Sequence, residues 1–146
     1  MTNKDCWETP DDLYYYLNRE FQFTLDAAAN EHNFKHPNYY SEENSALDKD
    51  WSGSVWCNPP YSRILINKFA DKIIEVSENT LVDIVTLTRL DPSAKWFKKL
   101  HKEACHMHFL PKRLRFKGAD SSYPFPCCLM YFNIQPKNIG AYFNYD

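Results

Sequence analysis

The spacing of apolar residues along the chain predicts three helices and several short strands. Helices are expected to begin at Pro10, Ser62 and Pro92, because the apolar residues that follow recur three or four positions apart and share one face. In the second helix that face consists of Leu65, Ile66, Phe69, Ala70, Ile73 and Ile74. Strands are expected where short runs are continuously apolar or alternate with polar residues. These runs are residues 21–25, 54–57, 81–88, 106–110 and 127–134.

Helices that alternate with short apolar strands indicate an α/β fold, in which a mainly parallel sheet is flanked by helices. Ligands of such sheets bind beyond the carboxyl ends of the strands. Asp26 and Asn58 each follow a predicted strand, so they should lie on the same rim if those two strands are parallel. Residues 30–51 are polar and predict mostly loop, with one short helix.

Two of the helix starts carry a local signal. Thr9 is suited to cap the first helix and Pro10 to occupy its first position, with Asp12 three residues after Thr9. Asp91 and Pro92 repeat this combination before the third helix.

Composition and charge narrow the picture only slightly. A chain of 146 residues without repeats or linkers fits a single domain, residues 1–146. The net charge of −2 does not indicate a nucleic-acid partner, but Lys112, Arg113, Arg115 and Lys117 lie close together. Such a run is ordinarily a solvated face, and its other interpretation is contact with phosphates. The aromatic content of 16% is high, and aromatic rings also stack on flat ligands.

The cysteines and histidines do not indicate disulfides or a metal. The five cysteines have no framework spacing and the chain has no long apolar run, which predicts a reduced cytoplasmic protein without a membrane segment. A cluster contains His101, Cys105, His106 and His108 but no Cys-x-x-Cys pair, so no metal is expected there. Burial in a core strand is expected instead for Cys105 and for one or two of these histidines.

Asn58-Pro59-Pro60-Tyr61, directly after the predicted strand 54–57, is the most informative stretch. A rigid turn accounts for the prolines but not for the amide and the phenol beside them. The Asn58 side-chain oxygen and the Pro59 carbonyl could accept hydrogen bonds from the two N–H groups of an aromatic amine. Its lone pair would then localise on nitrogen and attack an electrophile. Tyr61 would offer a flat face to the ring.

Taken in order, the motifs of the chain resemble those of the small phage-type DNA N6-adenine methyltransferase family. The resemblance runs from about Trp7 to Phe132 and implies a compact, Rossmann-like methyltransferase fold. It further implies transfer of a methyl group from S-adenosylmethionine to the exocyclic N6 amine of adenine in DNA. The matching motifs are WETP (7–10), FTLDAAA (23–29), ALDKDW (46–51), VWCNPPYS (55–62), TLTRLDPSAKWF (86–97) and LPKRLRF (110–116).

The resemblance also implies roles for individual residues. The catalytic loop would be Asn58, Pro59, Pro60 and Tyr61. The cofactor would contact Trp7, Thr9, Pro10, Asp26, Ala27, Ala28, Asp50 and Trp51. DNA phosphates would contact Lys112, Arg113, Arg115 and Lys117, or these residues would order the rim of the site. Plainer interpretations stay open: a helix start at Thr9 and Pro10, a turn at Asp26, and loop capping or core at Asp48, Asp50 and Trp51.

The sequence departs from the broad methyltransferase pattern in two respects. Ala27, Ala28 and Ala29 stand where a Gly-x-Gly cofactor loop is usual, and only 32 positions separate Asp26 from Asn58. The chain also shows no separate target-recognition domain, so its specificity would be short or loose, or would require a homodimer. The target adenine would have to leave the base stack, and Tyr61 would receive it.

Other acceptors and a non-enzymatic role compete with DNA methylation. The same catalytic loop would serve a methyltransferase acting on RNA adenine or on a protein glutamine amide. A relative that has lost catalysis would be a DNA-binding module, although such a module has no use for an intact amine site. The basic run and the aromatic content favour nucleic acid. A phage or prophage gene is then expected, with protection from restriction as its benefit.

Overall fold

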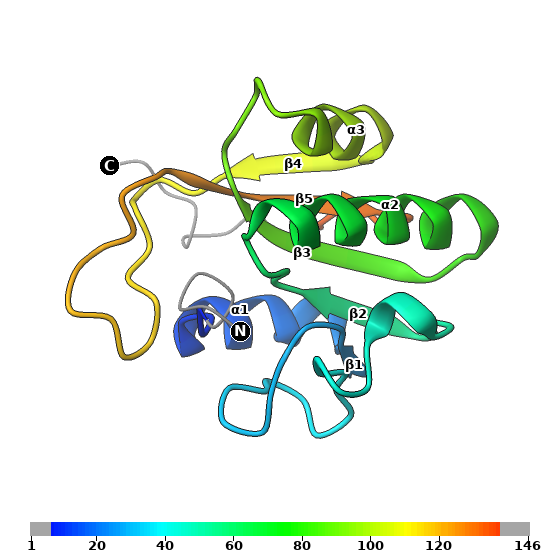
Figure 1. The fold of residues 1–146 in the computed structure, drawn as a ribbon, viewed down its shortest axis with the longest axis horizontal. Coiled ribbons are helices and arrows are strands. Elements are labelled where there is room, and N and C mark those ends of the chain that lie inside the picture. Colours follow the sequence, from blue (N-terminus) through cyan, green and yellow to red (C-terminus); the bar gives the residue numbers. More distant parts are fainter. Residues whose placement is uncertain (1–6, 138–146) are drawn as a thin grey trace.

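The computed structural model describes residues 7–137. Helices and strands alternate as the apolar spacing predicts, which confirms the α/β class (Figure 1). The strand predicted at residues 54–57 has those bounds. In chain order the elements are α1 (Asp11–Phe21), β1 (Leu25–Asp26), the short 3-10 helix η2 (Ala46–Asp48), β2 (Ser54–Cys57), α2 (Arg63–Asn79), β3 (Asp83–Arg89), α3 (Lys95–Glu103), β4 (His106–Phe109) and β5 (Cys127–Phe132).

Within the described residues, the five strands form one sheet in the order β1-β2-β3-β5-β4. The pairings β1–β2 and β2–β3 are parallel, whereas β5 is antiparallel to both β3 and β4. The sheet is therefore mixed, and the mainly parallel sheet expected from the sequence is not confirmed. The reason lies in the connections: helices carry the chain back between β2, β3 and β4, but no helix separates β4 from β5.

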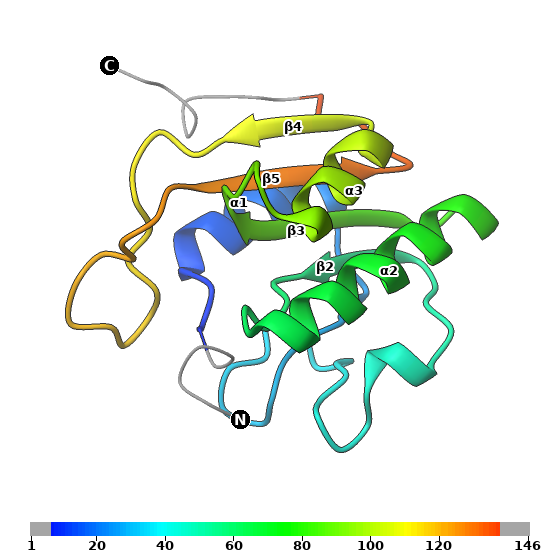
Figure 2. The same ribbon diagram turned by 45° about the horizontal axis from the view of Figure 1, so that its top comes forward.

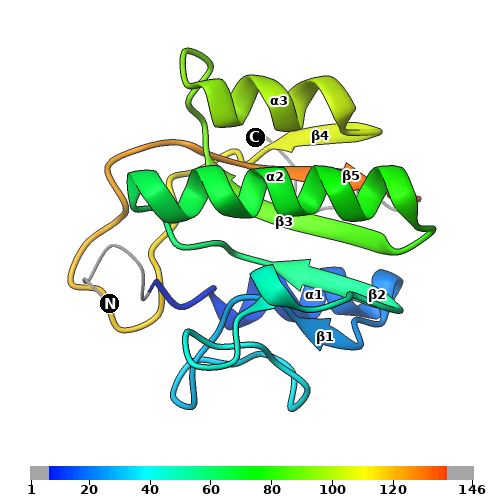
Figure 3. The same ribbon diagram turned by 45° about the vertical axis from the view of Figure 1, so that its right-hand side comes forward.

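The helices cover both faces of the sheet. Figures 2 and 3 show α1 behind the sheet, and α2 and α3 together in front of it. Tyr14 of α1 packs edge-on against Trp56 of β2, with ring centroids 5.8 Å apart. The side of α2 that faces the sheet buries Ile66, Phe69, Ala70, Ile73 and Val76. Each large apolar side chain buried in this way contributes about 1.5–3 kcal/mol.

The first helix begins later than its sequence signal predicts. Helix α1 starts at Asp11, Pro10 precedes it, and the Thr9 side chain does not cap it. Instead, the Thr9 hydroxyl accepts a hydrogen bond of 3.1 Å from Nδ2 of Asn58. The prediction that Thr9 is a helix cap is therefore wrong, because its side chain faces the loop after β2.

Helix α3 begins at Lys95, beyond the Asp91-Pro92 start that the sequence predicts. The Asp91 carboxylate does not cap the helix, because it accepts hydrogen bonds from Arg89 and Ser93. Its backbone carbonyl accepts from the N–H of Ala94 and closes a turn before the helix.

The parallel pairing of β1 with β2 brings two distant polar residues to one rim. Asp26 is paired with Trp56 in this register, so Asn58 follows two residues beyond. The prediction that Asp26 and Asn58 share a rim is confirmed. Strand β1 itself is shorter than predicted, because Phe21 ends α1 and Gln22 adopts a left-handed conformation with φ of 49°.

Replacing Gly53 by alanine should destabilise the entry into β2. Gly53 has a φ of +75°, and a Cβ there would overlap the Thr24 hydroxyl, which bonds the backbone of Ser54. Left-handed strain and overpacking together predict a loss of roughly 2–4 kcal/mol in the free energy of unfolding. Urea unfolding measures it.

The matched control is Gly118→Ala, at a φ of +83° where a Cβ meets no atom within 4 Å. It should lose only the strain contribution, roughly 1–2 kcal/mol. Equal losses in the two variants would contradict the proposed overlap with Thr24.

Candidate active site

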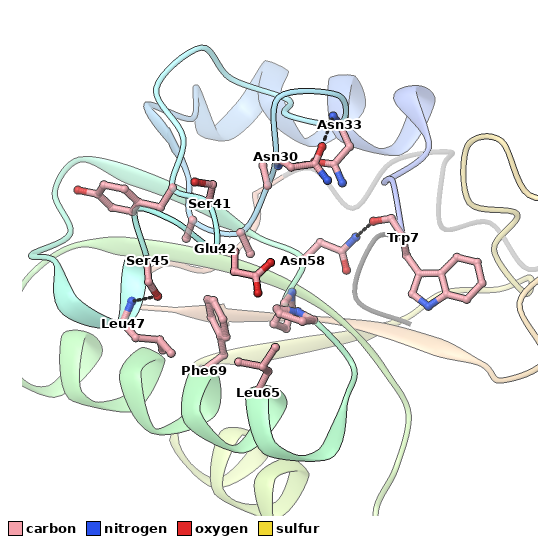
Figure 4. Close-up of a pocket in the computed structure, with 16 residues that line it drawn as sticks. Trp7, Asn30, Asn33, Ser41, Glu42, Ser45, Leu47, Asn58, Leu65 and Phe69 are labelled. Carbon is pink, nitrogen blue, oxygen red and sulfur yellow. Dashed lines mark hydrogen bonds between the residues drawn. The ribbon is translucent and has the colours of Figure 1, made fainter. Parts of the chain in front are cut away.

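An open pocket of about 730 Å³ lies beyond the carboxyl ends of β1 and β2. That volume includes the solvent-filled space at its open mouth. Its walls are the loop after β1, the segment leading into η2, the loop after β2 and the first turns of α2 (Figure 4). The sequence-predicted site residues that line it are Trp7, Ala27, Ala28, Asn58, Pro59 and Pro60.

Three hydrogen bonds fix the side-chain amide of Asn58. Its Nδ2 donates to the carbonyl oxygen of Trp7 and to the hydroxyl of Thr9, each at 3.1 Å. Its Oδ1 accepts from the hydroxyl of Tyr61 at 3.0 Å. Both N–H groups are therefore used within the protein, and the oxygen keeps a second lone pair as an acceptor. Asn58 is 9% exposed and lines the pocket.

Trp7, Thr9 and Pro10 support the site in different ways. The carbonyl of Trp7 bonds Asn58, but its indole points away from the pocket and stacks on Phe116, with centroids 5.3 Å apart (Figure 4). Thr9 is buried behind Asn58, and neither Thr9 nor Pro10 lines the pocket. Of this predicted cofactor-binding segment, only Trp7 reaches the pocket wall.

Tyr61 is not the exposed platform that the sequence suggests. Its ring is only 5% exposed and packs against Tyr123 and Phe116, with centroids 5.8 and 6.3 Å away. Burial raises the pKa of its phenol. The expectation that Tyr61 presents a flat face to a ligand is therefore not met in this structure, because residues of the loop between β4 and β5 cover the ring.

Asp26 lies behind the pocket wall and shapes it. The residue is buried, and its carboxylate accepts hydrogen bonds from the backbone N–H groups of Ala28 and Lys35, at 3.2 and 3.0 Å. Burial raises the pKa of this carboxyl to about 7, although the two N–H groups and the Lys35 charge act to lower it. Asp26 thus holds residues 27–35, the alanine loop, in place without lining the pocket.

Lys35 connects the alanine loop to the start of α1. Its ammonium group is almost fully buried and pairs with Glu8 at 3.1 Å and with Asp11 at 2.6 Å. The same two carboxylates also pair with Lys117, at 3.5 and 3.1 Å. One cluster of four charges therefore joins the loop after β1, the start of α1 and the loop between β4 and β5.

Asp50 and Trp51 lie outside the pocket, contrary to the expectation that they contact the cofactor. Trp51 is buried, and its indole N–H donates to the carbonyl of Ala46 at 3.0 Å. Asp50 is exposed and uses its backbone carbonyl to accept from Tyr40. Both residues hold the segment that follows β1 in place. The wall at this point is formed by Ser45 and Leu47 instead.

Glu42 is a pocket residue that the sequence did not reveal. Its carboxylate is directed into the pocket, on the side of Asn58 and Phe69 (Figure 4). Glu42 lies in a polar loop without periodicity, so no local pattern marks it. Its position results from backbone hydrogen bonds that join residues 38–40 to β1 and to the alanine loop. Further polar groups missed in the same way are Asn30, Asn33, Ser41 and Ser45.

The basic run lies on the loop between β4 and β5. Lys112, Arg113 and Arg115 are exposed, whereas Leu114 and Phe116 between them are buried. Arg115 donates from Nε to the carbonyl of Ala119 at 3.1 Å. Lys117 differs from the others because it is ion-paired with Glu8 and Asp11.

In residues 7–137, no three side chains of His, Cys, Asp or Glu are grouped so that they could hold a metal ion. His106 and His108 contact each other through their Nε2 atoms at 3.2 Å. Cys105 is exposed rather than buried, because it precedes the edge strand β4. None of the helices described is both long and apolar enough to cross a bilayer.

The buried carboxyl of Asp26 should make the stability depend on pH. Its pKa is 3.8 when unperturbed and about 7 in the folded chain, so between these values the folded state binds the extra proton. Stability should therefore fall as the pH rises through this window and level off above it. Asp26→Asn removes the titration. The difference in unfolding free energy between wild type and variant should fall by about 1.4 kcal/mol per pH unit between pH 5 and 6.

Urea unfolding at several pH values measures this difference. The matched control is Asp120→Asn, which changes an exposed carboxylate and should leave the profile parallel to that of wild type. A wild-type-minus-Asp26→Asn difference that stays constant from pH 5 to 7 would show that the Asp26 carboxyl is ionised throughout.

Comparison with known proteins assigns the chain to a family. Residues 1–126 match the family described as DNA N-6-adenine-methyltransferase (Dam). The DNA N-6-adenine-methyltransferase of Haemophilus phage HP1 is 38% identical over 99 residues, which is 66% of this chain and 56% of the relative. The DNA N-6-adenine-methyltransferase of Escherichia phage T1 is 37% identical over 108 residues, which is 71% of this chain and 44% of that relative. The chain spans about half the length of these curated relatives. It belongs to the DNA N-6-adenine-methyltransferase (Dam) family.

Proposed function

We propose that the chain transfers a methyl group from S-adenosylmethionine to the N6 amine of adenine in DNA. The observation that carries the proposal is Asn58, whose amide is fixed at the pocket with an acceptor oxygen beside Pro59. We further propose that the sheet is a compact Rossmann-like methyltransferase fold and that residues 1–146 act as one domain. Membership of the family supports each of these proposals.

The pocket suits S-adenosylmethionine better than a phosphorylated nucleotide. Its lining includes the Glu42 carboxylate and, among the described residues, no Lys or Arg side chain. Without a Lys or Arg side chain, this part of the lining offers no cation to a phosphate group, which favours a ligand without phosphates. Ala27, Ala28 and Ala29 line one wall and let a ligand approach the backbone closely although glycines are absent. When bound, the cofactor supplies an electrophilic methyl group whose sulfur leaves with the bonding electrons.

Asn58 and Pro59 would activate the adenine amine. The free lone pair of Asn58 Oδ1 and the Pro59 carbonyl accept hydrogen bonds from the two N–H groups of the adenine amine. These bonds draw the amine nitrogen towards tetrahedral geometry. Pro59 and Pro60 hold the backbone of this loop stiff, so the two acceptors need little reorganisation. The nitrogen becomes positively charged as it gains the methyl group and then loses a proton to water. No strong base is required for this step.

The exposed basic residues of the loop between β4 and β5 would bind DNA phosphates. Lys112, Arg113 and Arg115 are the proposed contacts, while Lys117 anchors the loop through its carboxylate partners. Because Phe116 stacks on Trp7, whose carbonyl bonds Asn58, this loop lies next to the proposed catalytic residue. A base that leaves the duplex reaches Tyr61 only after the aromatic cover shifts.

Asn58→Ala should reduce methyl transfer to DNA by about 10²–10³-fold, since it removes one of the two acceptors for the amine. The cofactor dissociation constant should change by less than about threefold, because most of the pocket wall is untouched. The loss of activity is measured as transfer of labelled methyl to N6 of adenine in an oligonucleotide. Calorimetry measures the cofactor dissociation constant. Activity above a tenth of wild type would rule out the acceptor role.

The matched control is Asn79→Ala, an exposed asparagine at the far end of α2 whose amide bonds the carbonyl of Glu75. It should keep wild-type activity. If the wild type binds the cofactor but labels no DNA, RNA adenine and protein glutamine become the acceptors to test. If it does not bind the cofactor, the proposed function fails.

Replacing both Lys112 and Arg113 by alanine should lower the affinity for DNA and make that affinity less dependent on salt. The log–log slope of affinity against salt should become shallower by about 1.8, since each lost phosphate contact contributes about 0.9 on duplex DNA. Fluorescence anisotropy at several salt concentrations measures the slope. Lys98→Ala on the exposed side of α3 is the control and should not change it. An unchanged slope in the double variant would make the run a solvated face.

A further inference from the structure

We infer that Arg89 is a positioning residue that holds Tyr61, and through it the acceptor oxygen of Asn58; as a statement about catalysis, this inference rests on the proposed function. Arg89 is the last residue of β3, the strand that lies beside β2 in the sheet. Its Nη1 donates to the backbone carbonyl of Tyr61 at 3.2 Å.

The guanidinium group of Arg89 is held on three sides. Besides the Tyr61 carbonyl, its Nε and Nη2 both lie 3.4 Å from Oδ2 of Asp91. Its central carbon lies 5.2 Å from the ring centroid of Trp96, the distance of a cation–π contact. A planar group with several fixed donors, oriented in this way, can hold one backbone carbonyl in a defined place.

Two residues at the end of β3 contact Tyr61. Arg89 donates to the backbone carbonyl of Tyr61, and the carbonyl of Leu87 lies 3.3 Å from the Tyr61 hydroxyl. This hydroxyl has one proton, and Oδ1 of Asn58, at 3.0 Å, is the nearer of its two acceptors. A shift of Tyr61 would therefore move the group that orients the acceptor oxygen. The chain of contacts runs from Arg89 to Tyr61 to Asn58, and of these three residues only Asn58 lines the pocket.

The catalytic loop needs such an external anchor. Pro59 and Pro60 have no N–H groups, so this part of the loop cannot bond the neighbouring strand through backbone donors. A carbonyl of the loop has to accept from another part of the molecule, and Arg89 provides that donor for Tyr61. The guanidinium lies behind the loop and does not line the pocket, so Arg89 acts on the reaction through other residues.

Arg89→Gln and Arg89→Lys test the inference in the full-length chain. Arg89→Gln should lower kcat by about 30–100-fold, the scale of a small misplacement of a catalytic group. Arg89→Lys keeps the charge but not the fork of donors, and should lose about tenfold. The cofactor dissociation constant and the KM for DNA should each change by less than about threefold. Asp91→Asn, which loosens the guanidinium without removing it, should show a smaller loss of kcat in the same direction.

The matched control is Lys99→Gln, which breaks an exposed ion pair of 3.2 Å with Asp71. It should leave kcat unchanged. A raised KM for DNA at unchanged kcat would make Arg89 a phosphate contact instead. A loss of cofactor binding and thermal stability in parallel with kcat would make it a general structural residue. Either outcome overturns the inference, and Arg89→Lys and Asp91→Asn decide the matter if Arg89→Gln does not fold.

Hydrogen exchange separates this inference from the proposed function. In Arg89→Gln, amides in a peptide covering residues 58–66 should exchange at least about fivefold faster than in wild type, whereas a peptide covering residues 77–84 should not change. That result holds whether or not the chain methylates DNA. If the wild type transfers no methyl group but the exchange result is obtained, Arg89 still positions the loop and only the proposed function fails. Unchanged exchange at residues 58–66 overturns the inference directly.

Discussion

The hydrogen bonds of the Asn58 amide are the interaction on which the proposed site depends. They join the loop after β2 to residues that precede α1 and to Tyr61 at the end of the same loop. A free asparagine side chain could present either its oxygen or its nitrogen to a ligand. Because the carbonyl of Trp7 can only accept a hydrogen bond, Nδ2 stays turned towards it and the oxygen is left to accept. The chemistry proposed for the amine therefore follows from contacts made behind the pocket.

A second network holds the pocket wall where glycines would be expected. The Asp26 carboxylate accepts hydrogen bonds from two backbone N–H groups of the alanine loop. The buried ammonium of Lys35 joins the same loop to Glu8 and Asp11 through ion pairs. The Asp26 carboxyl and the Lys35 ammonium are both buried, and burying a charged group is costly unless it is well bonded. Here each of the two has several partners. The small side chains of the wall can thus stay in place without the tight glycine turn of related pockets.

The sequence was sufficient for the parts of the fold set by local patterns. Strand β2, the apolar face of α2 and the shared rim of Asp26 and Asn58 follow from periodicity and from the rule for parallel strands. The roles of Thr9 and Glu42 could not be predicted, because both depend on contacts between segments far apart in the chain. The cover over Tyr61 was missed for the same reason: Phe116 and Tyr123 lie more than fifty residues beyond it. Local signals placed the proposed catalytic loop but not its surroundings.

The antiparallel strand that the sequence did not predict explains how one sheet could bring together the two parts of the proposed function. Strand β4 is antiparallel to β5, as is β3, so β3 and β4 end at the same edge of the sheet. The loop that leaves β4 therefore starts at the edge of the sheet where β2 also ends, and β5 begins at that edge too (Figure 1). The topology thus places both ends of this loop on the side of Asn58. The contacts of Phe116 with Trp7 and of Tyr123 with Tyr61 then bring the aromatic cover to the loop after β2.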